Sequence, residues 1–190
     1  IDVVNQNTPS DQREFSIRNQ YIYKHLSNLK NYIMSKTRTD KLLFIDTDIL
    51  VNPDVITKLL KHGKKIISGL IYNGYLTNEE KPYLYPNIMK MDEEGQYRHI
   101  ANYHVKNAST LLCSQVQKVD LTGAVIMLDR SVYKSVKYGF HLQGEDAFFC
   151  KMAQDKGFEL FCDLHVYCQH IMSPEFLKLY LKGELIINEI

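Results

Sequence analysis

Two aspartates, Asp46 and Asp48, stand two positions apart directly after the apolar run Leu42–Ile45. In an extended chain, residues i and i+2 point to the same side, so both carboxylates can reach one spot. Carboxylates held together repel each other, and a hard divalent cation with oxygen ligands removes that repulsion. Such a cation could bind a diphosphate and neutralise charge on a phosphate leaving group. The alternative is an ordinary pair of turn or capping acids.

A second acidic pair, Glu145 and Asp146, follows Gly144 at the start of a predicted helix that ends before Gly157. A carboxylate can accept the proton of an acceptor hydroxyl when it lies within hydrogen-bond reach of that group. Acids in the first turn of a helix also stabilise the helix, by ~0.3–1 kcal/mol each. The pair is therefore either a general base with its neighbour or a structural helix start.

Cysteine and histidine gather late in the chain, within Cys162–His170. Four side chains of this segment, Cys162, His165, Cys168 and His170, could in principle form a zinc site. Val166, Cys168 and His170 share a face if the segment is extended, whereas Cys162 and His165 need not join them, which disfavours zinc. We expect the cysteines to be reduced core residues. For His170 two alternatives stay open, a metal ligand or a half-buried structural histidine.

The elements predicted around these residues have an α/β order. Lys41–Asp46 has an apolar middle on both faces, which is typical of a central strand in a covered sheet. Tyr72–Gln96, rich in proline, glycine and tyrosine, is predicted as loop. Helical spacing of apolar residues predicts a long helix from about Asp11 to Ser35, with a buried face of Phe15, Ile22, Leu26, Leu29 and Ile33. The other predictions are helices at 52–62, 131–137, 145–156 and 174–181, and strands at 65–71, 115–119, 123–128, 158–162 and 166–170.

The composition is that of a globular domain, with 190 residues of which 45% are apolar and 24% charged. Lysine and arginine number 23 and the acids 22, so no clustered positive field predicts a nucleic-acid partner. No apolar run approaches the ~20 residues that span a bilayer, so we expect no transmembrane segment in this chain. The four cysteines fit a cytoplasmic protein, free or peripheral to a membrane, while a lumenal location stays open.

The stretch Leu43–Asp48 resembles the D-x-D strand of glycosyltransferases with the GT-A fold, particularly those of family 2. Other stretches resemble further motifs of that family in the same order along the chain. These motifs are an Arg-Asn pair in the preceding helix, a strand and glycine turn under the acceptor site, a Glu-Asp motif at a helix start and a late histidine. Here they read Ser16–Asn19, Asp120–Ala124 with Met127–Arg130, Gly144–Phe149 and Cys168–His170. The resemblance implies an α/β fold of the GT-A (Rossmann-like) type, with a mixed, mainly parallel central sheet flanked by helices.

The family resemblance also implies a nucleoside-diphosphate sugar as donor, linked to UDP or GDP, and a divalent cation, Mn²⁺ or Mg²⁺. By this resemblance Asp48 is the main metal ligand, Asp46 contacts the donor ribose or the metal, and His170 completes the coordination. We favour Mn²⁺, because it accepts an imidazole more readily than Mg²⁺ does. Arg18 and Gly123 are placed with the donor-binding residues.

The transfer step is assigned by the same resemblance. In similar inverting enzymes the Asp of the Glu-Asp motif is the base, so Asp146 takes that role, with Glu145 as an acceptor-binding residue or alternative base. The acceptor would be a hydroxyl of a saccharide, a lipid or a protein. Such domains begin with a strand–helix unit that binds the nucleotide base, whereas only Ile1–Asn7 precedes the long helix here. We therefore expect one catalytic domain over residues 1–190 that is incomplete at its N-terminus.

Three other functions fit parts of the sequence. A haloacid-dehalogenase-type phosphatase would use Asp46 as its nucleophile, but that motif normally opens its domain, and no convincing late Gly-Asp-x-x-x-Asp motif follows. A nucleotidyltransferase that makes sugar nucleotides would want a glycine-rich, basic phosphate loop, and none is visible. A non-catalytic carbohydrate- or protein-binding module is disfavoured by the joint presence of Asp46, Asp48, Asp146 and His170.

Overall fold

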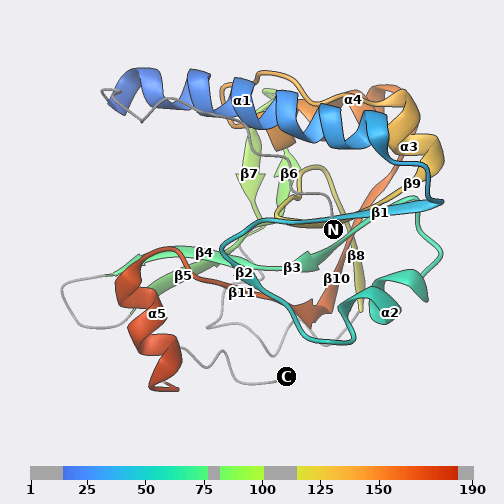
Figure 1. Ribbon diagram of the computed structural model, residues 1–190. Helices are drawn as coiled ribbons and strands as arrows, with labels where there is room; N and C mark the ends of the chain where they lie inside the picture. The colour runs from blue at the N-terminus through green and yellow to red at the C-terminus, as the bar shows by residue number, and fades with distance from the viewer. Residues whose placement is uncertain (1–14, 77–81, 101–114, 184–190) are drawn as a thin grey trace.

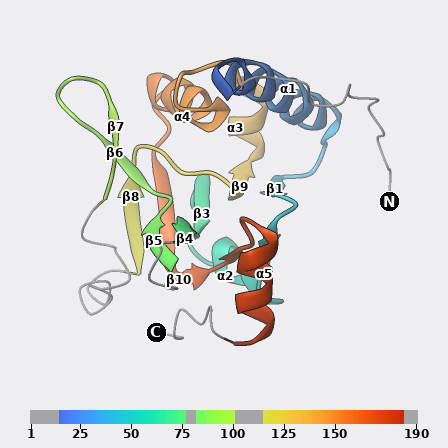
Figure 2. The same cartoon turned by 90° about the vertical axis from the view of Figure 1, so that its left-hand side faces the viewer.

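The computed structural model describes residues 15–76, 82–100 and 115–183, and it leaves the side chains of 15–20, 75, 76, 82 and 83 undescribed. A central sheet lies between two layers of helices, as Figures 1 and 2 show. One face is covered by α1 (Phe15–Lys36), α3 (Arg130–Ser135) and α4 (Glu145–Asp155). The other face is covered by α2 (Val55–Leu60). The predicted layered α/β architecture is therefore confirmed.

The central sheet has five strands in the order β1-β9-β3-β10-β8. The strands are β1 (Lys41–Ile45), β9 (Val125–Asp129), β3 (Ile66–Leu70), β10 (Leu160–Tyr167) and β8 (Val116–Val119). Only β3 and β10 pair in parallel, while the other three pairs are antiparallel. A mainly parallel sheet is thus not confirmed, because β9 inserts between β1 and β3 and runs against both.

The strand that precedes the Asp46–Asp48 pair lies at an edge of this sheet, not in its centre as predicted. Within the described residues, β1 pairs with β9 alone. Its burial is correspondingly uneven: Phe44 is buried, whereas Ile45 is exposed. Apolar residues on both faces of a strand therefore did not identify a central position here.

Alternate residues of β9 enter two separate cores, as expected for a strand whose side chains point to opposite faces in turn. Ile126 and Leu128 pack on the side of α1, α3 and α4. Val125 and Met127 pack on the side of α2, together with Val55. The sheet is therefore covered on both faces, and β9 anchors both cores.

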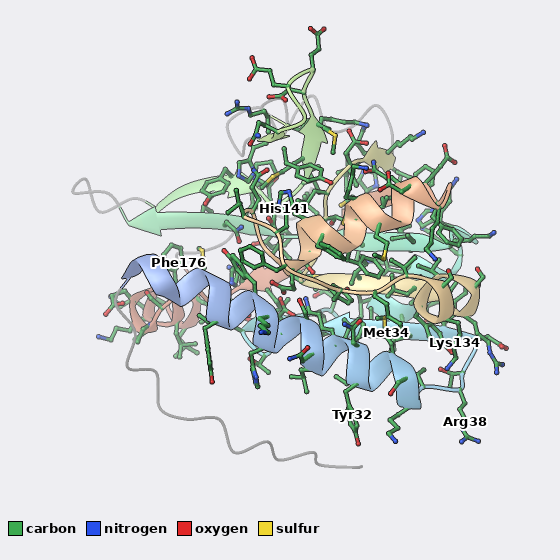
Figure 3. The ribbon with its side chains drawn as sticks, turned by 90° about the horizontal axis from the view of Figure 1, so that it is seen from above. Tyr32, Met34, Arg38, Lys134, His141 and Phe176 are labelled. Atoms are coloured by element: carbon green, nitrogen blue, oxygen red, sulfur yellow. The ribbon has the colours of Figure 1, made fainter. Side chains whose placement is uncertain are left out.

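Helix α1 turns a different face inward from the one predicted. Ser27, Lys30 and Met34 are buried, at spacings of three and four residues, while the apolar residues Leu29 and Ile33 are only partly buried beside them. Seen from above in Figure 3, Tyr32 projects away from the fold and Met34 lies over the sheet. The buried stripe of this long helix thus contains a lysine.

The prediction that Tyr72–Gln96 is a loop is wrong, because two β-hairpins begin within this segment. The first pairs β4 (Tyr72–Leu76) with β5 (Pro82–Pro86), and the second pairs β6 (Met89–Met91) with β7 (Tyr97–His99). The turn of the second hairpin contains Gly95 with φ of +76°, a conformation that glycine adopts without a steric penalty. Proline and glycine therefore marked strand ends and a turn in this segment.

The three helices after this segment follow their predictions to within two residues, whereas residues 160–167, predicted as parts of two strands, form the single strand β10. Helix α5 (Pro174–Leu181) begins after Ser173, whose hydroxyl accepts a hydrogen bond from the Phe176 amide. Helix α2 begins two residues later than expected, at Val55, so Asn52 does not cap it with its side chain. Two short strands, β2 (Ile49–Leu50) and β11 (Gln169–His170), form a separate antiparallel pair. No helix in the described ranges combines the length and apolarity that crossing a membrane requires.

Candidate functional site

The backbone between β1 and β2 carries the first acidic pair. The Asp46 amide donates to the carbonyl of Ala124 at 2.9 Å, and the Ile49 amide donates to the carbonyl of Asp46 at 3.1 Å, which closes a turn. The Ile171 amide then donates to the carbonyl of Asp48 at 2.8 Å. The short β2–β11 pair therefore fixes the late histidine segment against Asp48.

His170 and Asp48 meet at this β2–β11 pair. Nε2 of His170 lies 3.3 Å from Oδ2 of Asp48, and Nδ1 of His170 lies 2.9 Å from Oδ1 of Asn73. An amide oxygen can only accept, so Nδ1 carries the proton of that bond. The remaining nitrogen, Nε2, then faces the Asp48 carboxylate. Asp48 and His170, which were predicted to bind one metal ion, are thus in contact, and Asn73 orients the ring.

The separation of the two donor atoms suits a shared cation. It is longer than the 2.7–2.9 Å of a typical charge-assisted hydrogen bond between nitrogen and a carboxylate. Two atoms bound to one cation at ~2.1 Å and a right angle lie roughly 3 Å apart. A histidine that donates its other nitrogen to a fixed oxygen, here on Asn73, is also the usual arrangement of a metal ligand.

Only two of the three predicted metal ligands, Asp48 and His170, are in contact with each other. Among the described residues, no group of three or more His, Cys, Asp and Glu side chains is arranged to hold a metal ion. Asp48 and His170 are in contact, whereas no hydrogen bond or ion pair joins Asp46 to either of them. Of the three predicted ligands of Mn²⁺ or Mg²⁺, the structure therefore brings one carboxylate and one imidazole into contact, and Asp46 does not join them.

Asp46 interacts electrostatically with members of both acidic pairs and with Lys30. Burial raises its pKa to about 6, and Lys30 opposes that rise, while Asp146, Asp48 and Glu145 add to it by repulsion. No hydrogen bond of the Asp46 carboxylate to another described residue is present. Because Asp46 senses both Asp48 and Asp146, the two acidic pairs belong to one electrostatic site.

The second acidic pair begins α4 as predicted. Gly144 precedes the helix with φ of +108°, and Glu145 and Asp146 stand in its first turn. The Nζ atom of Lys30 lies 2.9 Å from Oε1 of Glu145 and 2.9 Å from Oδ1 of Asp146. The Glu145 side chain is 8% exposed and that of Asp146 23%. Of the two acids, Asp146 is therefore the more accessible to an acceptor.

Gly123 makes room for the Asp146 carboxylate. A Cβ atom at Gly123 would lie 2.0 Å from Oδ2 of Asp146. The next residue, Ala124, has φ of +60°, and the Val125 amide donates to the Gly123 carbonyl at 2.7 Å. This is a γ-turn of the rarer, strained kind, and such strain is concentrated at functional sites. The sequence prediction placed Gly123 with the donor; the structure places it against the candidate base.

Several sequence predictions have other outcomes. Arg18 lies in α1, but its side chain is outside the described residues. The zinc alternative is wrong, because Cys162 and Cys168 pack into different cores on opposite faces of the sheet and His165 is exposed. All three described cysteines are free and buried, as expected.

Lys30 and Asn73 were not predicted. Lys30 had a detectable signal, because it shares helical spacing with Ser27 and Met34 on one face. Asn73 had no such signal, since only the folded chain brings it to His170.

Neither a protein-family model nor a curated protein matches this chain. The geometry of the site is therefore the basis on which a function can be assigned.

Proposed function

We propose that this protein is a metal-dependent glycosyltransferase that moves a sugar from a nucleoside-diphosphate sugar to an acceptor hydroxyl with inversion. The observation that carries the proposal is the contact of Asp48 with His170, in a fold that also holds the Glu145–Asp146 pair on Lys30. One group can hold a cation and the other can accept a proton, and a transfer between a diphosphate and a hydroxyl needs both.

The donor half of the site is assigned to Asp48 and His170. A divalent cation held by Oδ2 of Asp48 and Nε2 of His170 would supply positive charge for the diphosphate. Mn²⁺ is favoured over Mg²⁺ because one of the two donors is an imidazole nitrogen. Asp46, with its pKa of about 6, is placed beside the cation and the donor ribose.

The acceptor half of the site is assigned to Asp146. Its Oδ1 atom is bound to Lys30, and Oδ2 lies over Gly123 without a hydrogen bond to another described residue. The acceptor oxygen forms the new bond to the sugar carbon as the bond to the diphosphate breaks, and the hydroxyl proton passes to Oδ2. Glu145 is buried against Lys30 and serves that ion pair. The acceptor is a hydroxyl of a saccharide, lipid or protein.

The proposal is tested by incubating the protein with UDP- and GDP-sugars and Mn²⁺, with and without an added acceptor. Release of nucleoside diphosphate is expected, and EDTA should abolish it. The Asp146→Asn variant should lower kcat by about 10²–10⁴-fold. The Glu145→Gln variant should retain more activity, because the wild-type Glu145 carboxylate is bound to Lys30 and does not face the acceptor. Hydrolysis of simple phosphomonoesters without turnover of any nucleotide sugar would overturn the proposal.

A further inference from the structure

Lys30 is a buried cation on the inner face of α1, next to the candidate base. Its side chain is 8% exposed, and an ammonium removed from water requires partners of opposite charge. Burial acts to lower its pKa, but Asp146, Tyr138 and Glu145 together raise it well above the ordinary range. Its Nζ atom also lies 4.9 Å from the centre of the Tyr138 ring. Lys30 therefore stays charged.

Contacts on either side of Lys30 fix its helix against the loop that precedes α4. The side chain of Asn31 donates to the carbonyl of Tyr138 and accepts from the Tyr138 amide, both at 2.9 Å. The Ser27 hydroxyl donates to the carbonyl of Gly139 at 3.0 Å. These bonds flank Lys30 along α1, so the ammonium is presented to α4 at a defined place.

The two carboxylate oxygens of Asp146 have different environments. Oδ1 receives the ammonium at 2.9 Å. Oδ2 packs against Gly123 and occupies the place that a Cβ atom would take, and it has no hydrogen-bond partner among the described residues. Glu145 shares the same ammonium but is more deeply buried. The side-chain orientation of Asp146 is thus set by Lys30 on one side and by the glycine on the other.

We propose that Lys30 is the positioning residue of the candidate base: it holds Asp146 by Oδ1 and leaves Oδ2 free for the acceptor hydroxyl. This inference rests on the proposed transferase function. A misplacement of ~1 Å at a reacting group can cost on the order of 10²-fold in rate. Lys30 contacts Asp146 directly and acts on Asp46 only through space, so its loss should lower turnover by much more than it weakens donor binding.

The test compares Lys30→Met, which keeps the length and apolar stem, with Lys30→Arg, which keeps the charge. Lys24→Met, on the exposed side of the same helix, is the matched control. For Lys30→Met we expect kcat to fall by about 10–100-fold, with the donor KM within about twofold of wild type. Lys30→Arg should recover part of kcat, and Lys24→Met should match wild type.

A second pair of variants covers the case in which Lys30→Met does not fold. The double variant Lys30→Met/Glu145→Gln removes one negative charge with the positive one, and it is compared with Glu145→Gln alone. The same loss of kcat at constant donor KM is expected. Equal kcat in the two proteins, or a loss of kcat that Lys30→Arg does not relieve, would overturn the inference. If wild type and Lys24→Met both turn over no nucleotide sugar, the proposed function itself fails, and this inference with it.

Discussion

Nε2 of His170 lies 3.3 Å from Oδ2 of Asp48, although 122 positions separate the two residues in the chain. The contact is made by the β2–β11 pair, in which His170 stands opposite Ile49. In the proposed function this carboxylate and this imidazole nitrogen are the two ligands of a divalent cation.

Removal of either partner should weaken binding of Mn²⁺. We expect Asp48→Asn and His170→Ala each to lower the affinity for Mn²⁺ by at least about tenfold in calorimetric titration. Asp54→Asn is the control, because Asp54 is exposed and pairs with Lys58 on α2. Unchanged affinity in Asp48→Asn would remove this residue from the cation site.

Asn73 should act on the same cation through His170. Its Oδ1 atom accepts from Nδ1 of His170 at 2.9 Å, which directs Nε2 to Asp48. Asn73→Ala is expected to weaken Mn²⁺ binding by roughly 10–100-fold, and ¹⁵N NMR of the cation-free wild type should show Nδ1 protonated. Asn52→Ala, with an exposed side chain, should change neither measurement. A wild-type His170 without a proton on Nδ1 would contradict this assignment.

Asp46 should make the fold less stable at neutral pH than in acid. Burial raises the pKa of Asp46 to about 6 from an ordinary value of 3.8. At a pH between these two pKa values, the Asp46 carboxyl is protonated in the folded protein and ionised in the unfolded chain. The contribution of Asp46 to the free energy of unfolding therefore decreases as pH rises from about 4 to about 6, and stays low above that.

The Asp46→Asn variant removes that penalty. In urea unfolding at pH 7.5 with EDTA present, we expect the free energy of unfolding of this variant to exceed that of wild type by on the order of 1–2 kcal/mol. This figure is lower than the pKa shift alone would give, because the Asp46 carboxyl is partly exposed to solvent. The difference should disappear near pH 4. Asp54→Asn, the same substitution at an exposed position that pairs with Lys58, is the control. A variant less stable than wild type at pH 7.5 would contradict the stated environment of Asp46.

Gly123 should not accept a side chain while Asp146 keeps its carboxylate. A Cβ atom would lie 2.0 Å from Oδ2 and 2.6 Å from Cγ of Asp146, so Gly123→Ala is expected to cost roughly 1–3 kcal/mol of stability. In an Asp146→Ala background most of that cost should vanish, because the clashing atoms are gone. Equal costs in both backgrounds would show that the close approach is not to Asp146.

Local sequence signals predicted much of the framework. Gly144 marks the start of α4, and Ser173 with Pro174 marks the start of α5; both are signals that act within one helical turn. The apolar run of β9 likewise predicted a strand from adjacent residues alone. Asp48 and His170 were identified as partners from the family resemblance, and the structure brings them into contact.

The sequence by itself determined the types of chemistry available and the local elements that carry them: two acidic pairs, one after a strand and one at a helix start. Only the tertiary structure decided that β1 is an edge strand, that β9 runs between β1 and β3, and that Lys30 joins Asp146 across 116 positions. Periodicity, capping and turn propensities act over a few residues. Strand order and buried ion pairs depend on which distant segments exclude water from one another, and no local pattern contains that information.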